Sequence, residues 1–255
     1  MNQKIIEQFG RQADAYYKSR YHSSGKDLET LVELAQPIET DFVLDLATGA
    51  GHTAFAVAKH GGRIVATDIT SRILDRARKA ATERNITNVE YLLCDAQAVP
   101  FADSAFDLVT CRAAPHHFSR IELAMKEAYR VLRPGGRAVI IDTGAPEDSG
   151  FHRFLDRIER IRDPSHNRRY SLAEWRGLFL SSGFEIEYAA IEEDVYMFDW
   201  WMKVAGVRDA ARREIEDTII KATPEQRQYF RFDIQDGRVV SLRSDRVIIK
   251  GRRPL

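Results

Sequence analysis

Residues 41–68 read DFVLDLATGAGHTAFAVAKHGGRIVATD, and this stretch decides the fold. Its first part, residues 42–46, is an apolar run broken by the single acid Asp45 and followed by a glycine-rich turn. That pattern predicts a buried parallel strand that feeds a tight loop. An alanine-rich helix over residues 53–60 and a second strand over residues 63–67 follow. The stretch is therefore predicted to be one βαβ unit with a loop that faces a ligand.

Two ligand classes fit the loop Gly49-x-Gly51 and the acid Asp68 at the tip of the second strand. A dinucleotide would place its pyrophosphate on the helix N-terminus. Asp45 stands just before the loop, where its carboxylate would repel a pyrophosphate but would suit ammonium and sulfonium charges. The charge pattern therefore favours S-adenosylmethionine (SAM) over a nicotinamide dinucleotide.

The segment VLDLATGAG at residues 43–51 resembles the first motif of class I SAM-dependent methyltransferases, particularly their UbiE-like small-molecule branch. Further matches follow in chain order: VATD at 65–68, CDA at 94–96, VPF at 99–101, FDLVTCR at 106–112, HHF at 116–118 and YRVLRPGG at 129–136. One departure is Ala47, where the family pattern often has glycine. Its methyl group is expected to narrow the room beside the methionine tail without abolishing binding.

The resemblance implies a Rossmann-like α/β fold with a doubly wound, mostly parallel seven-stranded sheet and helical insertions. Residues 1–255 are expected to form a single methyltransferase domain. Within it, the family pattern implies an N-terminal helical lid over residues 1–36 and a SAM-binding core over residues 40–142. Two insertions, at about 146–182 and 195–229, are expected to cap the acceptor.

The same resemblance implies roles for individual residues. Asp68 would hold the ribose hydroxyls, Asp95 would meet the adenine amino group, and the Ala96 backbone N–H would meet a ring nitrogen. Asp95 alone could equally be a turn or capping residue, but its register with Asp45 and Asp68 favours the cofactor role. The full set expected to bind SAM is Asp45, Ala47, Gly49, Gly51, Asp68, Ile69, Asp95, Ala96, Arg112 and Tyr17.

An aromatic segment near the N-terminus resembles the part of the family that folds over bound SAM. It comprises Tyr16, Tyr17, Ser19, Arg20 and His22. Packing of Tyr16 on the sheet explains the same pattern, so both interpretations stay open.

Methyl transfer from a sulfonium is an in-line displacement, for which the protein mainly supplies alignment. A general base is needed only for a poor nucleophile such as a phenol. His116 and His117 are the candidates, because an unperturbed imidazole titrates near neutrality. Packing or hydrogen bonding is the alternative role for each. A metal held by these histidines with Asp142 and His52 is rejected, because adjacent histidines on extended backbone point in opposite directions.

The methyl acceptor is not identified by any motif. Phe151, Phe154, Trp200 and Trp201 in the insertions suit a small, mostly apolar or aromatic acceptor, with core packing as the rival explanation for each. Three function classes remain: a small-molecule methyltransferase, which is favoured, a SAM-binding protein without methyl transfer (cyclase-like or regulatory), and a nicotinamide-dependent oxidoreductase.

Composition describes an ordinary globular chain. Its 255 residues are 44% hydrophobic, and 38 basic residues balance 38 acidic ones. No net field would recruit nucleic acid or an anionic membrane, so neither is expected as a partner. The absence of an apolar signal core predicts a cytoplasmic address, and the oligomeric state stays open. Cys94 and Cys111 lie on strands that two others should separate, so free thiols are expected.

Local signals predict several further elements. Ser119 to Glu122, Ser171 to Glu174 and Thr223 to Gln226 have the pattern of helix capping boxes. A helix over residues 151–162 should pair Arg153, Arg157 and Arg160 with Asp156 and Glu159 on a solvated face. Two closing strands, 239–242 and 246–251, should follow a turn at Asp236-Gly237.

Overall fold

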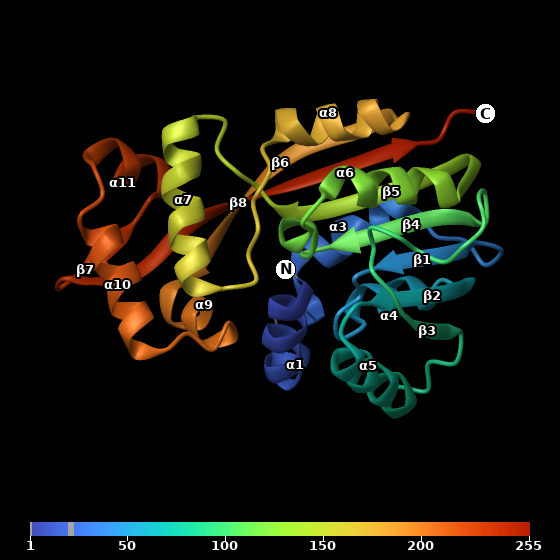
Figure 1. Ribbon diagram of the computed structural model, residues 1–255, viewed down its shortest axis with the longest axis horizontal. Helices are drawn as coiled ribbons and strands as arrows, with labels where there is room; N and C mark the ends of the chain where they lie inside the picture. Colours follow the sequence, from blue (N-terminus) through green and yellow to red (C-terminus); the bar gives the residue numbers. More distant parts are fainter. Residues whose placement is uncertain (1, 20–22) are drawn as a thin grey trace.

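The structure, a computed structural model, describes residues 2–19 and 23–255. One sheet runs through the described chain, with the strand order β3-β2-β1-β4-β5-β8-β6 (Figure 1). The first five strands pair in parallel, whereas β8 is antiparallel to both β5 and β6. The strands are β1 (Phe42–Leu46), β2 (Arg63–Asp68), β3 (Val89–Leu93), β4 (Phe106–Arg112), β5 (Leu132–Thr143), β6 (Glu185–Met197), β7 (Asp233–Gln235) and β8 (Arg238–Arg252). The predicted doubly wound, mostly parallel α/β sheet is confirmed, with the short β7 added beside β8.

Helices cover both faces of this sheet (Figure 1). They are α1 (Asn2–Lys18), α3 (Lys26–Ala35), α4 (His52–Ala58), α5 (Ser71–Glu83), the 3-10 turn η1 (Pro115–His117), α6 (Ile121–Val131), α7 (Ser149–Arg162), α8 (Leu172–Ser182), α9 (Phe198–Val204), α10 (Asp209–Ile220) and α11 (Pro224–Phe230). The expected helix over residues 53–60 is α4, shifted by one or two residues at its ends. The N-terminal region is helical as predicted.

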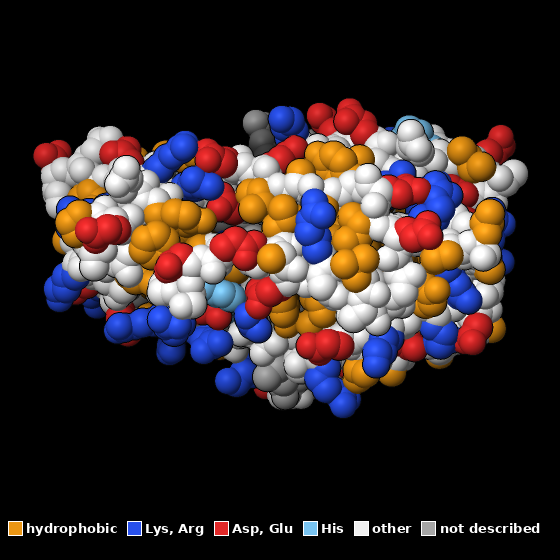
Figure 2. Space-filling model, turned by 90° about the horizontal axis from the view of Figure 1, so that it is seen from above, with side chains coloured by type: hydrophobic (Ala, Val, Ile, Leu, Met, Phe, Trp, Pro, Cys, Tyr) orange, Lys and Arg blue, Asp and Glu red, His pale blue; other side chains and the backbone are white. Residues whose placement is uncertain are grey.

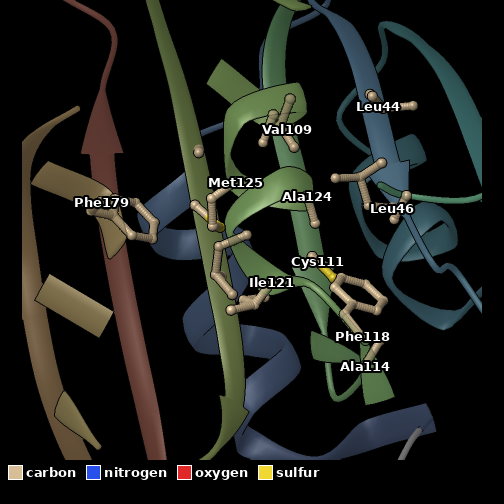
Figure 3. Packing of buried hydrophobic residues seen from close by; sticks show 14 of the residues in the cluster. Leu44, Leu46, Val109, Cys111, Ala114, Phe118, Ile121, Ala124, Met125 and Phe179 are labelled. Carbon is tan, nitrogen blue, oxygen red and sulfur yellow. The ribbon is translucent and has the colours of Figure 1, made fainter. Parts of the chain in front are cut away.

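The central strands are apolar on both faces because a hydrophobic core lies on each side of the sheet. On the face of α6 and α8, Val109 and Cys111 of β4 lie against Ile121 and Met125 (Figure 3). On the opposite face, Leu108 packs into a second cluster with residues of α3 and α4. The burial of both faces of β4 therefore explains why its sequence is a nearly continuous apolar run.

The long strands β6 and β8 continue beyond the parallel part of the sheet and carry a second lobe (Figure 1). Helices α7, α9, α10 and α11 and strand β7 surround this extension. Its core is a separate cluster that includes Phe198, Trp201, Ile215 and Leu242, all at most 2% exposed. Helix α7 of the first expected insertion and the helices of the second therefore pack around the antiparallel pair of β6 and β8, whereas α8 packs on the main sheet.

Several local predictions are confirmed. The Ser171 and Thr223 capping boxes are both formed. Asp236 and Gly237 adopt positive φ angles of 48° and 74° in the turn between β7 and β8. Cys94 and Cys111 are free thiols, and two strands lie between β3 and β4.

Other local predictions are wrong. The two expected closing strands are one continuous strand, β8. Arg120, not Ser119, precedes α6, and the Ser119 hydroxyl instead donates to Gln97 Oε1 at 3.0 Å. In α7, Asp156 and Glu159 are buried, so these acids do not belong to a solvated face.

On the face in Figure 2, acidic and basic side chains both occur along the length of the molecule. This mixture agrees with the balanced composition. None of the helices within residues 2–19 and 23–255 combines the length and apolarity needed to cross a bilayer.

Candidate active site

A cavity of about 930 Å³, including its open mouth, lies at the carboxyl edge of β1 to β4. This first cavity is where ligands of open α/β sheets bind. Most residues expected to bind SAM line it: Ala47, Gly49, Asp68, Ile69, Asp95, Ala96 and Arg112. The structure therefore brings together at one site residues that the sequence spreads from position 47 to position 112.

The loop after β1 approaches the cavity with left-handed backbone at Ala47 (φ 51°), Gly49 (φ 55°) and Gly51 (φ 89°). Gly49 lines the cavity. Gly51 is instead required for packing, because a Cβ there would lie 2.5 Å from the Phe55 ring. The second glycine of the motif therefore allows the loop to pack closely on the Phe55 ring and does not line the cavity.

Asp45 lies beneath this loop rather than on the cavity wall. Its two carboxylate oxygens accept hydrogen bonds from the hydroxyls of Thr48 (2.5 Å) and Thr110 (2.7 Å). Burial raises the pKa of Asp45 to about 6, although both hydroxyls and Arg112 favour its charged form. The expectation of direct contact is corrected: Asp45 holds the loop and adds charge below the ligand.

Two further acids lie at the cavity itself. One oxygen of Asp68 accepts the Gly49 N–H (3.0 Å) and the other accepts the Thr70 N–H (2.8 Å). Each carboxylate oxygen has two lone pairs, so Asp68 retains capacity for the hydroxyls of a ribose. Asp95 accepts from the backbone and side-chain amides of Gln97, which is the turn geometry that was its alternative role. These donor and acceptor sets fit an adenosine ligand without phosphate.

Helix α1 closes the first cavity with Ile5, Phe9 and Tyr16. Tyr17, also expected to bind SAM, is not among the residues that line this cavity. Its ring stacks on His52 (centroids 5.8 Å apart), and the Arg76 guanidinium lies over the same ring, 3.5 Å from its centroid.

Successive helical positions point about 100° apart, so one tyrosine faces the ligand site and the next faces α5. Ser19 is buried. Arg20 and His22, also expected near SAM, lie outside the described residues.

Arg112 is fixed by a partner that sequence reasoning missed. Its Nη1 lies 2.6 Å from Asp27 Oδ2, with both side chains at most 5% exposed, and its Nε donates to Thr53 Oγ1. Asp27 belongs to α3, 85 residues earlier in the chain. No local sequence pattern predicts this pair. The only indication in the sequence is that Asp27 lies on the apolar side of an amphipathic helix.

A second cavity of about 680 Å³ adjoins the first. Phe9, Tyr16, Ala113 and His117 line both, so they form the partition between the two spaces. Tyr196, Trp200 and Trp201 give the second cavity an aromatic wall. Its charged and titratable wall consists of Asp27, His116, His117, Asp142, Glu159, Arg162, Asp163, Arg169 and Arg246. The expected mostly apolar lining is therefore wrong.

Two aromatic residues expected at this opening lie elsewhere. Phe151 packs against Tyr229, with ring centroids 4.9 Å apart, and Phe154 packs against Phe230 at 5.7 Å. They stabilise the contact between α7 and α11, as the rival packing explanation held.

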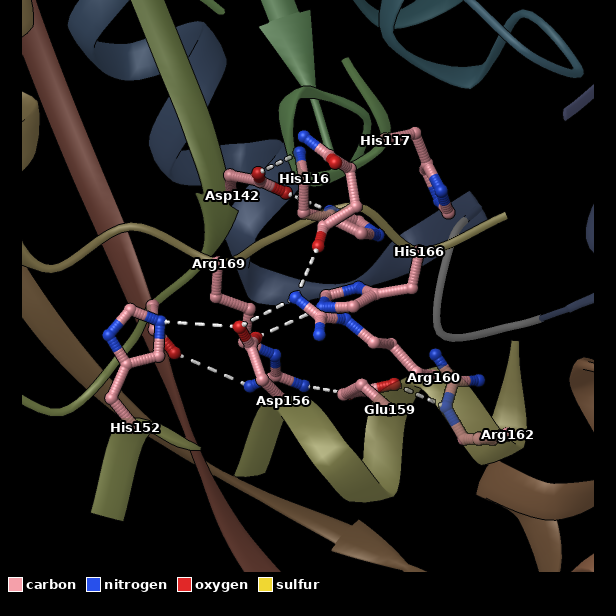
Figure 4. A network of polar contacts seen from close by, with 12 residues as sticks. His116, His117, Asp142, His152, Asp156, Glu159, Arg160, Arg162, His166 and Arg169 are labelled. Atoms are coloured by element: carbon pink, nitrogen blue, oxygen red, sulfur yellow. Dashed lines mark hydrogen bonds and ion pairs between the residues drawn. The ribbon is translucent and has the colours of Figure 1, made fainter. Parts of the chain in front are cut away.

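His116 and Asp142 form a buried pair on the wall of the second cavity (Figure 4). The two Asp142 oxygens lie 2.6 Å from His116 Nδ1 and 2.8 Å from its backbone N–H. A carboxylate only accepts, so Nδ1–H donates to it and Nε2 carries the lone pair. Asp142, at the end of β5, thereby orients the imidazole of His116 in η1.

His117 has a different environment. Its Nδ1 donates to the Ser165 carbonyl at 3.1 Å, and the Ser165 hydroxyl donates to Asp163. Burial, followed by the neighbouring His116, lowers the pKa of His117 to about 3. His117 is therefore neutral at working pH and is a poor proton acceptor.

A buried ionic network supports this wall (Figure 4). Glu159 of α7 pairs with Arg162 at 2.6 Å and with Arg169. Burial alone would raise the pKa of Glu159, but the two guanidiniums outweigh it and hold that pKa well below its usual range. The loop after α7 also donates two backbone N–H groups, from Asn167 and Arg168, to the His116 carbonyl. The sequence indicated none of these inward roles.

Comparison with known proteins shows the family. Residues 44–140 match the methyltransferase domain family. YcgJ of Bacillus subtilis (strain 168), an uncharacterized methyltransferase, is 32% identical over 95% of this chain and 96% of its own length. The solved structure of YcgJ has a TM-score of 0.87 at 31% identity, covering 90% of this chain and 99% of that protein. The solved structure of a methyltransferase-like protein from Bacillus halodurans C-125 has a TM-score of 0.88 at 36% identity, covering 91% of this chain and all of that protein.

The relationship to quinone-modifying enzymes is more distant. Demethylmenaquinone methyltransferase of Thermus thermophilus is 38% identical, but over only 52% of this chain and 62% of its own length. That relative therefore carries no information on the acceptor. Full-length similarity to YcgJ decides among the three function classes. The chain belongs to the SAM-dependent methyltransferases, and SAM is its methyl donor.

Proposed function

We propose that this methyltransferase acts on a small molecule held in the second cavity, with His116 as general base and Asp142 as its orienting partner. The observation that carries the proposal is the 2.6 Å pair of His116 Nδ1 and Asp142 Oδ1 on the cavity wall. The pair lies next to His117, one of the four residues that separate this space from the first cavity. A base at that partition is well placed for an acceptor that meets SAM there.

In this proposal the first cavity binds SAM. Asp68 accepts from the ribose hydroxyls, Asp95 and the Ala96 N–H recognise adenine, and the loop at Gly49 admits the methionine part. SAM supplies both the methyl group and the leaving group. Ala113, one of the residues that line both cavities, has a positive φ of 53°. Strained backbone of this kind is concentrated at functional sites, which supports a functional role for the partition.

The base acts through its free nitrogen. Nε2 of His116 takes the proton from an acceptor hydroxyl or amine as that atom attacks. The Asp142 carboxylate compensates the positive charge that the ring gains and keeps the tautomer fixed. His117 supports the partition by position, because its buried ring stays neutral.

The acceptor must match a wall of mixed character. Tyr196 and Trp200 suit a flat portion of the molecule, whereas the buried charged residues require polar groups on it. A small molecule with one flat or apolar part and at least one polar group satisfies both.

The test is turnover of SAM to S-adenosylhomocysteine with a panel of phenols, quinols and amines. General bases contribute about 10²- to 10⁴-fold, so His116→Ala should lower turnover of a hydroxyl acceptor within that range. Asp142→Asn should lower it less, and SAM affinity should be unchanged in both. His60→Ala, at an exposed histidine, is the matched control. Full activity of His116→Ala would remove the base and leave alignment as the only catalytic contribution.

A further inference from the structure

The side-chain amide of Gln97 joins two segments of the chain at the first cavity. Its nitrogen donates to both carboxylate oxygens of Asp95, at 3.0 Å and 3.2 Å. Its oxygen accepts from the Ser119 hydroxyl at 3.0 Å and from the Arg120 N–H at 2.7 Å. Gln97 and Asp95 both line the cavity and are only partly buried, so a bound ligand can reach them. The amide therefore links the loop after β3 to the start of α6 at the cofactor site.

The contacts of this amide decide which way it faces. The backbone N–H of Arg120 can only donate, so the atom that meets it is the Gln97 oxygen, and the nitrogen points at Asp95. The backbone N–H of Gln97 adds a further hydrogen bond to Asp95 Oδ1, at 2.9 Å. Backbone and side chain of one residue therefore hold this carboxylate in a single orientation.

The segment that receives the Gln97 oxygen is itself held in place. The His116 carbonyl accepts from the Asn167 N–H at 3.0 Å, and the Phe118 carbonyl accepts from the Asn167 side-chain amide at 2.7 Å. Two residues further on, Arg120 contacts Gln97. The segment from His116 to Arg120 is thus bonded at both ends, which gives the Gln97 amide a fixed anchor from which to orient Asp95.

We infer that Gln97 is a positioning residue that sets the preference for adenine in the methyl donor. It orients the Asp95 carboxylate to accept a hydrogen bond from the 6-amino group of adenine. A carboxylate offers about four acceptor sites, so Asp95 can accept from Gln97 and from adenine at the same time. This inference rests on the proposed function, since it takes the first cavity as the SAM site and Asp95 as the residue that meets adenine.

Calorimetry with two ligands tests the inference without requiring turnover. The ligands are S-adenosylhomocysteine and its purine analogue in which hydrogen replaces the 6-amino group. A hydrogen bond to a charged group is worth about a ten- to hundredfold change in affinity, so the wild-type protein should prefer S-adenosylhomocysteine by that factor. Gln97→Met keeps the length of the side chain but removes its donor and its acceptor. It should lower the preference by about two- to tenfold.

Gln97→Glu separates the two halves of the amide. A glutamate still accepts from Arg120 and Ser119, but it offers no donor to Asp95 and places a second carboxylate beside it. This variant should therefore keep the melting temperature and still lower the preference. Gln228→Met, at an exposed glutamine of α11, is the matched control and should retain the wild-type preference.

The ratio of the two affinities distinguishes positioning from a purely structural role. Loss of local structure would weaken both ligands equally, so an unchanged ratio in both Gln97 variants would overturn the inference and leave the adenine role of Asp95 intact. Equal binding of the two ligands by the wild-type protein would remove that role of Asp95, and the inference with it. Turnover of His116→Ala is a separate measurement, so neither result bears on the proposed base.

Discussion

Ala47 stands in left-handed backbone (φ 51°) at a position where glycine would be unstrained. A side chain in this region costs about 1–2 kcal/mol relative to ordinary backbone. Ala47→Gly should therefore raise the free energy of unfolding by about 1 kcal/mol, less the added entropy of the unfolded chain. Urea denaturation measures it, and Gly49→Ala, at φ 55°, should have the opposite effect. A destabilised Ala47→Gly would show that the methyl contact outweighs the strain.

Asp45 is expected to make stability depend on pH. Its pKa is raised by burial from 3.8 to about 6, so the folded state binds the proton more tightly than the unfolded chain. Its contribution is fully present below about pH 4 and is lost as pH rises through 6. The free energy of unfolding of Asp45→Asn, relative to that of wild type, should therefore rise by about 3 kcal/mol between pH 4 and pH 7. Chemical denaturation at several pH values measures this difference. A constant difference would contradict the assigned shift.

At the scale of single residues, the sequence predicted which acids gather at the sheet edge but not how each is used. Asp68 and Asp95 follow their strands directly, so strand geometry placed them in the cavity. Asp45 and Tyr17 do not line the cavity, because contact depends on which side of the backbone a side chain leaves. Adjacent positions differ in that respect, and the motif does not encode it.

The element scale is best tested in α7. Glu159 is 1% exposed and compensates both Arg162 and Arg169. Removing one partner of a buried ion pair typically costs about 3–5 kcal/mol, so Glu159→Gln should lower the free energy of unfolding by that amount. The control is Asp199→Asn, which breaks the exposed pair with Arg212 and should change stability by less than about 1 kcal/mol. Equal effects of the two variants would show that the network is not stabilising.

Elements were predictable where their signals are local. The capping boxes of α8 and α11 lie within four residues, and two glycines follow the end of α4 within four residues. Which side of α7 is buried was not predictable from the sequence of the helix itself. Its acids turn inward because Arg169, beyond its C-terminus, returns to meet Glu159. That compensation depends on tertiary structure, as does the Asp27–Arg112 pair.

At the scale of the whole molecule, the sheet order followed from the motif set, whereas the second lobe did not. Trp201 shows why, because it is 2% exposed in the lobe core and also lines the second cavity. Composition alone cannot separate these roles when one side chain has both. The continuous strand β8 was likewise divided in prediction, because the polar stretch at 243–246 reads as a break.

The two tryptophans should therefore respond differently. Trp201→Ala removes a buried aromatic and should cost about 3–5 kcal/mol of stability. Trp200→Ala, at a half-buried site, should largely keep the melting temperature while raising the acceptor Michaelis constant. Thermal melts and steady-state kinetics on both variants give the comparison. Loss of stability in Trp200→Ala with unchanged acceptor kinetics would assign it to the core.

Helix α1 contacts both α5 and α9, and the side chain of Gln8 donates to the Ala205 carbonyl at 2.8 Å. Its Phe9 and Tyr16 belong to both cavities at once. If α1 opens to release ligands, spent cofactor and methylated product would leave together, because these two residues line both cavities. Successive methylations of one acceptor molecule without release would be disfavoured, since renewing the donor also exposes the product. We expect this architecture to add one methyl group per encounter.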